Sequence, residues 1–552
     1  MKRKILFGIA TAGLLLTACP SKPSVPTPIP APQADATQPA EPAPAATSEP
    51  GEKKAVADVG PPAPTLFVLS GLKGYTEPCG CTLDILLGGI DRIAGYVEAH
   101  KKLARGSAVV DAGNTLFDTA QLEAYRVPQE KAKVEVIVQG MSALGVQYTT
   151  PGPNDFALGR DFYTDTMGTA GIEILASNLV ATGGEPLGPG HAFLTLGDTK
   201  VGVIGLVQED LFVGLEGLEV TKLVDAARKE LVAVKAAKPA AVVAVVHGDL
   251  KTVKALLAEV PEIDFAVVGH NPRMTDQVDP VGDSWTLEAY DQGRYVGVLK
   301  LYPAATRYQN ARKVSLADVE RVDRRIEQIE GQIERVPPAK SGEEPAFLLR
   351  LRGQLAEARA EKERVKNAGL SFPPKGTSAF VYRSVAMEPG YPQDAALTSA
   401  KDAFNAELEK LVSASPEPIP EVPEGERGYV GNARCATCHP TQMEFWKTTN
   451  HSRAINTLVK RNKSFDNNCV KCHVTGYRKP GGSVLGNFNN LENVGCEQCH
   501  GPGSDHVMAG DKTKIARDTP ATVCGECHND EHSPRFNYDV YRKSILGEGH
   551  GG

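Results

Sequence analysis

Hydrophobic positions between residues 65 and 303 follow two alternating patterns. Short runs of β-branched residues, bounded by Gly, Asn or Asp, have the length and composition of buried strands. Longer stretches between them repeat their apolar residues at helical spacing. This alternation predicts an α/β domain with a largely buried sheet. The expected strands are 66–69, 108–110, 172–176, 201–207, 241–246 and 265–268, and the expected helices include 90–103, 129–144 and 221–237.

A different helical pattern follows this region. Apolar residues recur at spacings of four and three from Val322 to Val336. After two prolines, the capping signal Ser341-x-x-Glu344 opens another helical stretch. The two stretches predict an antiparallel helical hairpin with a structural role. Its apolar positions are Val322, Ile326, Ile329, Ile333, Val336, Leu348, Leu351 and Leu355.

The first residues have the pattern of an export signal. A short basic stretch precedes an apolar run from Ile5 to Leu16, which is too short for a transmembrane helix. The run ends in Leu16-Thr17-Ala18-Cys19, which resembles the lipobox of bacterial lipoproteins. This resemblance implies that Cys19 is lipidated and anchors the chain to a membrane. The alternative is an ordinary signal peptide with an incidental cysteine.

Length and composition divide the chain further. At 552 residues it is too long for one core. A strand-like segment at 379–385, a helix at 397–411 and a Pro/Glu linker at 416–426 precede the last region. The expected domains are a signal peptide (1–18), a disordered Pro/Ala linker (19–62), an α/β domain (63–303), a helical hairpin (304–372), a strand–helix segment with linker (373–427) and a C-terminal domain (428–552).

Eight of the eleven cysteines lie in four copies of Cys-x-x-Cys-His. Two thiols at this spacing add to the vinyl groups of one haem, and the adjacent His becomes its proximal iron ligand. A zinc ribbon is the alternative, but a His after every pair and an exported location disfavour it. We expect four haem c groups in a mostly α-helical or irregular domain. The motifs are Cys435, Cys438 and His439; Cys469, Cys472 and His473; Cys496, Cys499 and His500; and Cys524, Cys527 and His528.

Four further histidines lie in the same region and are candidates for the second axial position of each iron: His451, His506, His532 and His550. Only two methionines compete with them there. We therefore expect bis-His ligation, which gives lower reduction potentials than His/Met ligation.

This region resembles the cytochrome c-554 type of tetrahaem protein. The resemblance is carried by "YVGNARCATCHPTQMEFWKTTNHSRA" (429–454), "CVKCHVTGY" (469–477) and "CEQCHGPGSDH" (496–506). It implies His451 and His506 as distal ligands. In that family one haem lacks a distal protein ligand, so His532 is either a ligand here or a surface histidine.

The α/β domain resembles the calcineurin-like metallophosphoesterases of the 5′-nucleotidase type. The framework segments are "VVDAGN" (109–114), "GPNDFALG" (152–159), "VVHGD" (245–249) and "VVGHNP" (267–272). The family binds two metal ions, but here Gly71-Leu72-Lys73 replaces its first metal motif and Asn114 replaces the bridging Asp. His247 and His270 remain, either as remnants of the site or as structural histidines. A two-metal hydrolase needs a bridging carboxylate and more ligands, so we expect no dinuclear metal and no hydrolase activity.

The α/β domain also contains Cys79-Gly-Cys81, directly after the first strand and before a helix expected to start near Leu86 or Gly88. A helix N-terminus favours the thiolate, and a disulfide ring this small is strained and easily reduced. These features indicate a redox-active pair, while a static disulfide and a two-thiolate metal half-site remain alternatives.

Together these features predict an oxidoreductase that links chemistry at Cys79 and Cys81, on an unidentified small molecule such as a reduced sulfur compound, to the haems. We expect it on the periplasmic side of the cell envelope, on the outer rather than the inner membrane, with another exported redox protein as partner. The net charge of −7 argues against nucleic acid. The alternatives are a pure electron-transfer lipoprotein with a docking domain, and a residual nucleotidase or phosphoesterase.

Overall fold

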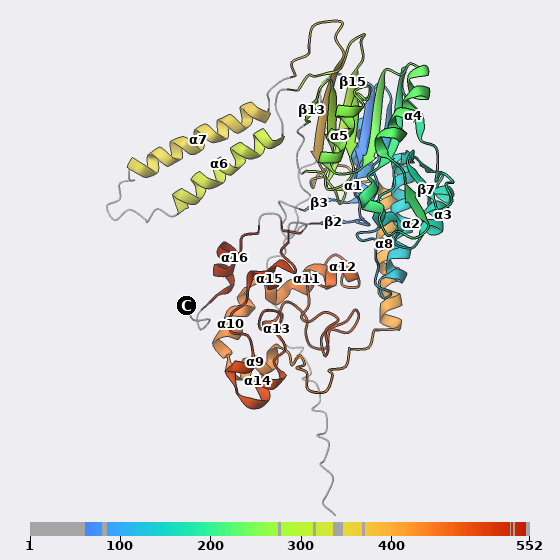
Figure 1. The fold of residues 1–552 in the computed structure, drawn as a ribbon. Coiled ribbons are helices and arrows are strands. Elements are labelled where there is room, and N and C mark those ends of the chain that lie inside the picture. The colour runs from blue at the N-terminus through green and yellow to red at the C-terminus, as the bar shows by residue number, and fades with distance from the viewer. Residues whose placement is uncertain are drawn as a thin grey trace, which may run out of the picture. The chain divides into compact units, whose positions relative to one another are not determined.

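The structure is a computed structural model that describes residues 61–79, 86–273, 278–312, 316–334, 346–366, 370–529, 532–533 and 536–547. The expected signal peptide, nearly all of the linker, Cys19, Cys81 and His550 lie outside these residues. Two β-sheets with flanking helices form the α/β region, and short helices form the C-terminal region (Figure 1). No helix of the described residues combines the length and the hydropathy needed to cross a bilayer.

One sheet has seven strands among the described residues, in the order β16-β17-β15-β1-β4-β5-β6. Strands β1, β4, β5 and β6 are parallel, and β15 pairs antiparallel with both β1 and β17. The strands are β1 (Thr65–Leu69), β4 (Ser107–Asp111), β5 (Val146–Thr149), β6 (Glu173–Ile174), β15 (Tyr295–Tyr302), β16 (Gln309–Asn310) and β17 (Ala379–Ala386).

The other large sheet has six strands among the described residues, in the order β13-β14-β12-β11-β9-β8. Its central strands β9, β11, β12 and β14 are parallel. The strands are β8 (His191–Leu196), β9 (Thr199–Val207), β11 (Ala241–His247), β12 (Phe265–Val268), β13 (Pro280–Val281) and β14 (Ser284–Glu288). Two small ladders join β7 (Leu179–Ala181) to β10 (Leu218–Val220) and β2 (Pro78–Cys79) to β3 (Leu87–Gly88).

Successive side chains of a strand point to opposite faces of its sheet and so contribute to different hydrophobic cores. Leu66 and Val68 of β1 belong to the core between the sheets, while Phe67 belongs to the core on the outer face. Likewise, Val243 of β11 faces the inner core and Val242 the opposite one. Burial on both faces explains why the strands read as continuous apolar runs. The expected α/β sandwich is confirmed, and its helices are α1 (Ile90–Lys101), α2 (Val127–Leu144), α3 (Arg160–Ala170), α4 (Leu223–Ala236), α5 (Leu250–Glu259) and α8 (Ala395–Ala414).

The hairpin of α6 (Leu316–Glu334) and α7 (Ala346–Lys366) packs around a small apolar cluster that includes Val322, Ile329 and Leu351. Arg325, in the first half of α6, pairs with Glu361, near the end of α7, at 3.0 Å, which agrees with an antiparallel arrangement of the two helices. Strand β17 follows the hairpin and pairs with β15 along its full length. The sheet therefore extends past the boundary expected at residue 303, and the hairpin is an insertion between two of its strands.

The C-terminal region consists of short helices joined by turns, as expected. One apolar cluster, containing Ile455, Leu458, Val470, Val474 and Leu485, lies beside α11 and α12. The helices are α9 (Asn432–Cys438), α10 (Pro440–Thr448), α11 (Ala454–Val459), α12 (Asn467–Val470), α13 (Cys496–His500), α14 (Ser504–Ala509), α15 (Ala521–Gly525) and α16 (Tyr538–Ile545).

Candidate functional site

Each Cys-x-x-Cys-His motif lies on or at the end of a short helix: α9, α12, α13 or α15. In the first and third motifs both cysteines lie in one helix, α9 or α13, where residues three apart lie on the same side, so their two thiols face the same way. None of the eight cysteines is in a disulfide. Each motif thus presents two thiols that are not in disulfides next to a histidine, which is the donor set that haem attachment requires.

Backbone carbonyls orient several of the histidines. Nδ1 of His473 lies 2.7 Å from the carbonyl oxygen of Ala454, and Nδ1 of His500 lies 2.7 Å from that of Ala516. Nδ1 of His506 lies 2.9 Å from the carbonyl oxygen of Asp511. An Nδ1–H that donates to a carbonyl leaves the lone pair of Nε2 for a metal. These rings are therefore held in the tautomer that an iron ligand needs. His528 differs, because its Nδ1 lies 3.1 Å from the hydroxyl of Ser533.

Two pairs of histidine rings, each with one proximal and one distal candidate, have the same centroid separation. The ring centroids of His439 and His506 are 6.2 Å apart with an angle of 27° between the ring planes, and those of His451 and His528 are 6.2 Å apart at 47°. A metal bonded to one nitrogen of each ring, at about 2 Å on either side, separates the centroids by about 6 Å. Burial lowers the pKa of both His451 and His528, which favours the neutral form that binds a metal. The spacing of both pairs fits an iron between the rings.

The motifs also lie close to one another. The backbone N–H of Cys496 donates to Asn432 Oδ1 at 2.9 Å, three residues before Cys435, and the nearby thiol of Cys496 raises the pKa of Cys435. Burial raises the pKa of Cys499 to about 11, and Cys524 adds to this shift. The first motif is therefore next to the third, and the third is next to the fourth, in an order that differs from the sequence.

A cavity of about 530 Å³ lies beside the third motif. Its wall includes Tyr429, Cys499, His500 and Pro520. This volume is within the range of roughly 300–1,000 Å³ typical of small-molecule and cofactor sites. The residues present at this motif therefore fit a haem.

Glu497, inside the third motif, is a functional residue that sequence reasoning missed. Its carboxylate is 2% exposed and accepts hydrogen bonds from the backbone N–H groups of Val430 (3.0 Å), Gly431 (2.8 Å) and Gly503 (2.8 Å). It ties the third motif to the segment before the first. No pattern in the sequence distinguishes it from an exposed glutamate.

In the α/β region, the predicted remnants His247 and His270 lie together, with ring centroids 5.5 Å apart. Nδ1 of His247 is 2.7 Å from the carbonyl oxygen of Ala112, and burial lowers the pKa of His247 to about 3. Lys73 Nζ lies 2.6 Å from Asp291 and helps to lower the pKa of His270, for which burial is the main cause. A lysine ammonium therefore lies near the two imidazoles.

Asn114 adopts the left-handed conformation, with φ of 52°. The carboxylate of Asp155 accepts the N–H groups of Asn114, Thr115 and Leu116 at 2.7–2.9 Å and fixes this loop. Burial raises the pKa of Asp155 to about 6, although the N–H donors favour its ionised form. Within the described part of the chain, no group of three or more His, Cys, Asp and Glu side chains is arranged to hold a metal ion. The absence of a dinuclear metal stays a prediction.

The Cys79 segment differs from the expected structure. Pro78 and Cys79 pair with Leu87 and Gly88 in the ladder of β2 and β3, so α1 begins at Ile90 and not near Leu86 or Gly88. The side chain of Cys79 lies outside the described structure, as does Cys81. His532 lies in a turn after the fourth motif and is half-buried.

The four motifs and the two histidine pairs have the residue types and the spacing of c-type haem sites. Residues 434–501 match the model of the family described as "Cytochrome c554 and c-prime". Cytochrome c-554 of Nitrosomonas europaea is 33% identical over 125 residues, which cover 19% of this chain and 53% of that protein. The chain thus spans about half the length of this curated relative. The relationship supports haem c as the cofactor of the C-terminal region.

Among solved structures, a 5′-nucleotidase precursor from Thermus thermophilus is 16% identical, with a TM-score of 0.44, over 65% of this chain and 61% of that one. The sulfate thiohydrolase SoxB from Thermus thermophilus is 15% identical, with a TM-score of 0.44, over 64% and 62%. The calcineurin-like phosphoesterase YfkN from Bacillus subtilis is 21% identical, with a TM-score of 0.37, over 44% and 86%.

Proposed function

We propose that this chain is an exported electron-transfer protein that binds four haem c groups. The observation that carries the proposal is the set of four Cys-x-x-Cys-His motifs, two of which lie with a second histidine at the spacing of a bis-His iron site. The paired thiols hold the porphyrin, and the adjacent histidine ligates the iron. Haem supplies reversible one-electron chemistry when bound.

For the axial ligands, we propose that His506 is the distal partner of His439 and that His451 is the distal partner of His528. His532 and His550 are the candidates for the two other haems, one of which lacks a protein ligand if the family pattern holds. Imidazole on both sides of the iron gives a low potential compared with His/Met ligation. The order of neighbouring motifs, first to third to fourth, supplies a path between those haems.

We place the protein on the periplasmic side of the cell envelope, held on the outer membrane by a lipid on Cys19. Pro20 follows the cysteine where an Asp would favour retention in the inner membrane. Its electron partner is then another exported redox protein. The Pro-rich sequence that follows Cys19 would separate the folded regions from the anchor and so allow the haem region to contact such a partner.

A second function, thiol chemistry at Cys79 and Cys81, is favoured by one contact. Glu77, two residues before Cys79, accepts a hydrogen bond at 2.8 Å from Lys463, six residues before Cys469. Oxidation of the two thiols to a disulfide would release two protons to water and two electrons, which haems held at the Cys-x-x-Cys-His motifs would accept one each. Two substrate thiols would then reduce the disulfide by exchange: the first forms a mixed disulfide with one cysteine, and the second displaces that cysteine, so that the substrate leaves as a disulfide and both cysteines regain their protons.

The haem count tests the main proposal. The purified full-length protein is expected to contain four covalent haems by pyridine haemochrome assay and intact mass. Cys469→Ala combined with Cys472→Ala is expected to contain three, because each motif attaches its haem independently. Cys79→Ser combined with Cys81→Ser is the control and is expected to keep four. A wild-type protein with zinc and no haem would refute the proposal.

The thiol proposal has its own test, in which the haems are reduced with dithionite or oxidised with ferricyanide before alkylation. We expect Cys79 and Cys81 to be alkylated in the reduced protein and protected in the oxidised one, because the pair exchanges electrons with the haems. Mass spectrometry of the peptide that contains both residues measures this. Alkylation that is the same in both states would favour a docking domain without redox chemistry.

A further inference from the structure

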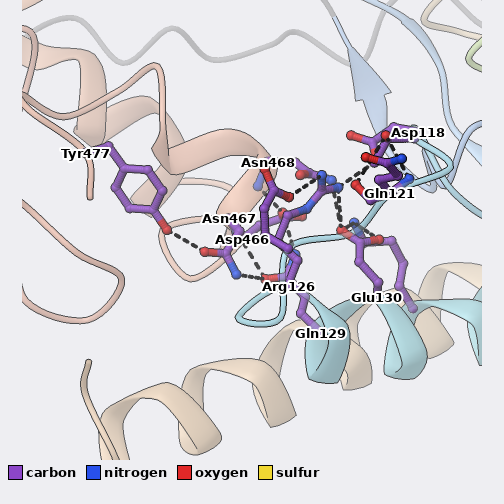
Figure 2. A network of polar contacts seen from close by, with 12 residues as sticks. Asp118, Gln121, Arg126, Gln129, Glu130, Asp466, Asn467, Asn468 and Tyr477 are labelled. Carbon is purple, nitrogen blue, oxygen red and sulfur yellow. Dashed lines mark hydrogen bonds and ion pairs between the residues drawn. The ribbon is translucent and has the colours of Figure 1, made fainter. Parts of the chain in front are cut away.

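A network of buried polar side chains joins helix α2 to the segment before the second haem motif (Figure 2). Gln129 Nε2 donates to Asp466 at 2.8 Å, and Gln129 Oε1 accepts from the backbone and side-chain N–H groups of Asn467 at 3.1 and 3.0 Å. Tyr477 donates its hydroxyl to Asn467 Oδ1. Gln129, Asp466 and Asn467 are all buried. Both ends of the Gln129 amide thus hold the start of α12.

Charged side chains of α2 lie beside this network. Glu130 is 2% exposed and Lys133 is 3% exposed, and Lys133 Nζ lies 3.3 Å from Glu130. Glu130 also accepts from Asn468 Nδ2 at 3.2 Å. Burial opposes the charged form of Lys133, but Asp466 and Glu130 outweigh it and raise the Lys133 pKa, and Cys469 acts in the same direction. A buried cation of the α/β region therefore lies within electrostatic reach of the first thiol of the second motif.

A second contact reaches the same segment. Lys463 donates to Glu77 at 2.8 Å and to Asn405 at 2.7 Å, and Lys401 donates to the other oxygen of Glu77 at 3.1 Å. Lys463, Lys401 and Asn405 are buried. Both contacts thus converge on residues 463–468, immediately before Cys469.

Such contacts favour one fixed arrangement. Separating them would leave several charges and amides without partners, and each loss is costly in a buried setting. Free motion is the usual expectation for two regions of one chain that share a small polar interface. Here the interface polar groups are buried and paired, so the second motif is held against α2.

We propose that helix α2 docks the second haem motif and that Lys133 and Glu130 set the reduction potential of the haem bound there. Electrons would then pass between the α/β region and the other haems through the haem attached to Cys469 and Cys472. This inference rests on the proposed haem function and adds which haem faces the α/β region and which residues tune it.

The sign of the tuning follows from electrostatics. Ferric haem carries one more positive charge than ferrous haem, so a nearby cation disfavours the ferric state and raises the potential. Removing the ammonium of Lys133 should lower that potential, and removing the carboxylate of Glu130 should raise it. Shifts of opposite sign at one haem are what a tuning role requires, whereas a purely structural role gives no such pattern.

The test is a spectroelectrochemical titration of full-length Lys133→Met and Glu130→Gln. We expect one of the four couples to shift by roughly tenfold in its redox equilibrium constant, about 59 mV for one electron. The shift should be negative for Lys133→Met and positive for Glu130→Gln. His473→Met, which changes the spectrum of the second haem alone, identifies the couple that moves. Because Glu130→Gln keeps its shape and its acceptor oxygen, it remains informative if Lys133→Met does not fold.

Lys131→Met and Glu135→Gln are matched controls on the exposed side of the same helix, and they should leave all four couples in place. Four normal couples that do not shift in Lys133→Met or Glu130→Gln would overturn the inference and leave the electron-transfer function intact. Equal shifts of all four couples would also overturn it. Loss of the couples from the wild-type protein would instead refute the proposed function itself.

Discussion

Replacing His506 with Ala is expected to convert one haem from the low-spin to the high-spin ferric state. His506 is the ring that lies 6.2 Å from His439, and its Nδ1 is held at 2.9 Å from a carbonyl oxygen. Without it, the iron on His439 would lose its second imidazole, and a five-coordinate or water-ligated iron has a weaker ligand field. Electron paramagnetic resonance measures the change directly, and the potential of that haem should rise because bis-His ligation is lost.

His451→Ala should produce the same conversion at a different haem, the one on His528, and the double variant should convert two. Added imidazole should restore the low-spin signal by filling the vacated position. His191→Ala is the control, because this histidine lies in β8 and contacts Glu230, far along the chain from any motif. An unchanged low-spin signal in His506→Ala would mean that another residue ligates this iron.

Local patterns in the sequence were enough to predict most of the α/β fold. The apolar runs at 201–207, 241–246 and 265–268 became β9, β11 and β12 because burial on both faces leaves a signal that is visible in each strand alone. The partner of β17 was not predictable in this way. A strand-like pattern at 379–385 says nothing about pairing with β15, which lies before the helical hairpin in the chain.

In the haem region, too, local features were predictable from the sequence and contacts between distant segments were not. Thiol spacing fixes which residues attach each haem, and it is a local property of the sequence. The pairing of each distal histidine with an iron depends on how the turns fold. The residues therefore predicted four candidate ligands, and the resemblance implied His451 and His506 among them, without saying which iron each would ligate. Gln129 and Asp466 could not be found at all, because their amide and carboxylate are ordinary until the structure buries them together.

Asp466→Ala is expected to cost about 1–3 kcal/mol of unfolding free energy, the range for leaving a buried hydrogen-bonding group without its partner. Asp466 is buried, accepts from Gln129 and caps α12 through the N–H of Asn468 at 2.9 Å. Lys133 and Lys463 would also lose the negative charge of Asp466, with which both interact electrostatically. Denaturant unfolding, followed by the Soret absorbance and by tryptophan fluorescence, measures the loss.

The loss should depend on pH with a defined sign. Burial opposes ionisation of Asp466, but Lys133 and Lys463 outweigh it and hold its pKa below the ordinary value in the folded state. Its contribution is therefore complete above the unfolded pKa of about 4 and is lost as the pH falls through the folded value. The difference between wild type and variant should be constant from about pH 5 to 8 and shrink below about pH 4.

Asp511→Ala is the matched control, because this aspartate also caps a helical turn, through the N–H of Thr513 at 2.9 Å, but is only half-buried. It should lose far less stability than Asp466→Ala. If the two variants lose the same amount, the buried charges of α2 contribute nothing beyond a helix cap. A selective loss in Asp466→Ala, with coincident transitions in Soret absorbance and tryptophan fluorescence, would instead mean that the α/β and haem regions unfold together and that the residues before the second motif stabilise both.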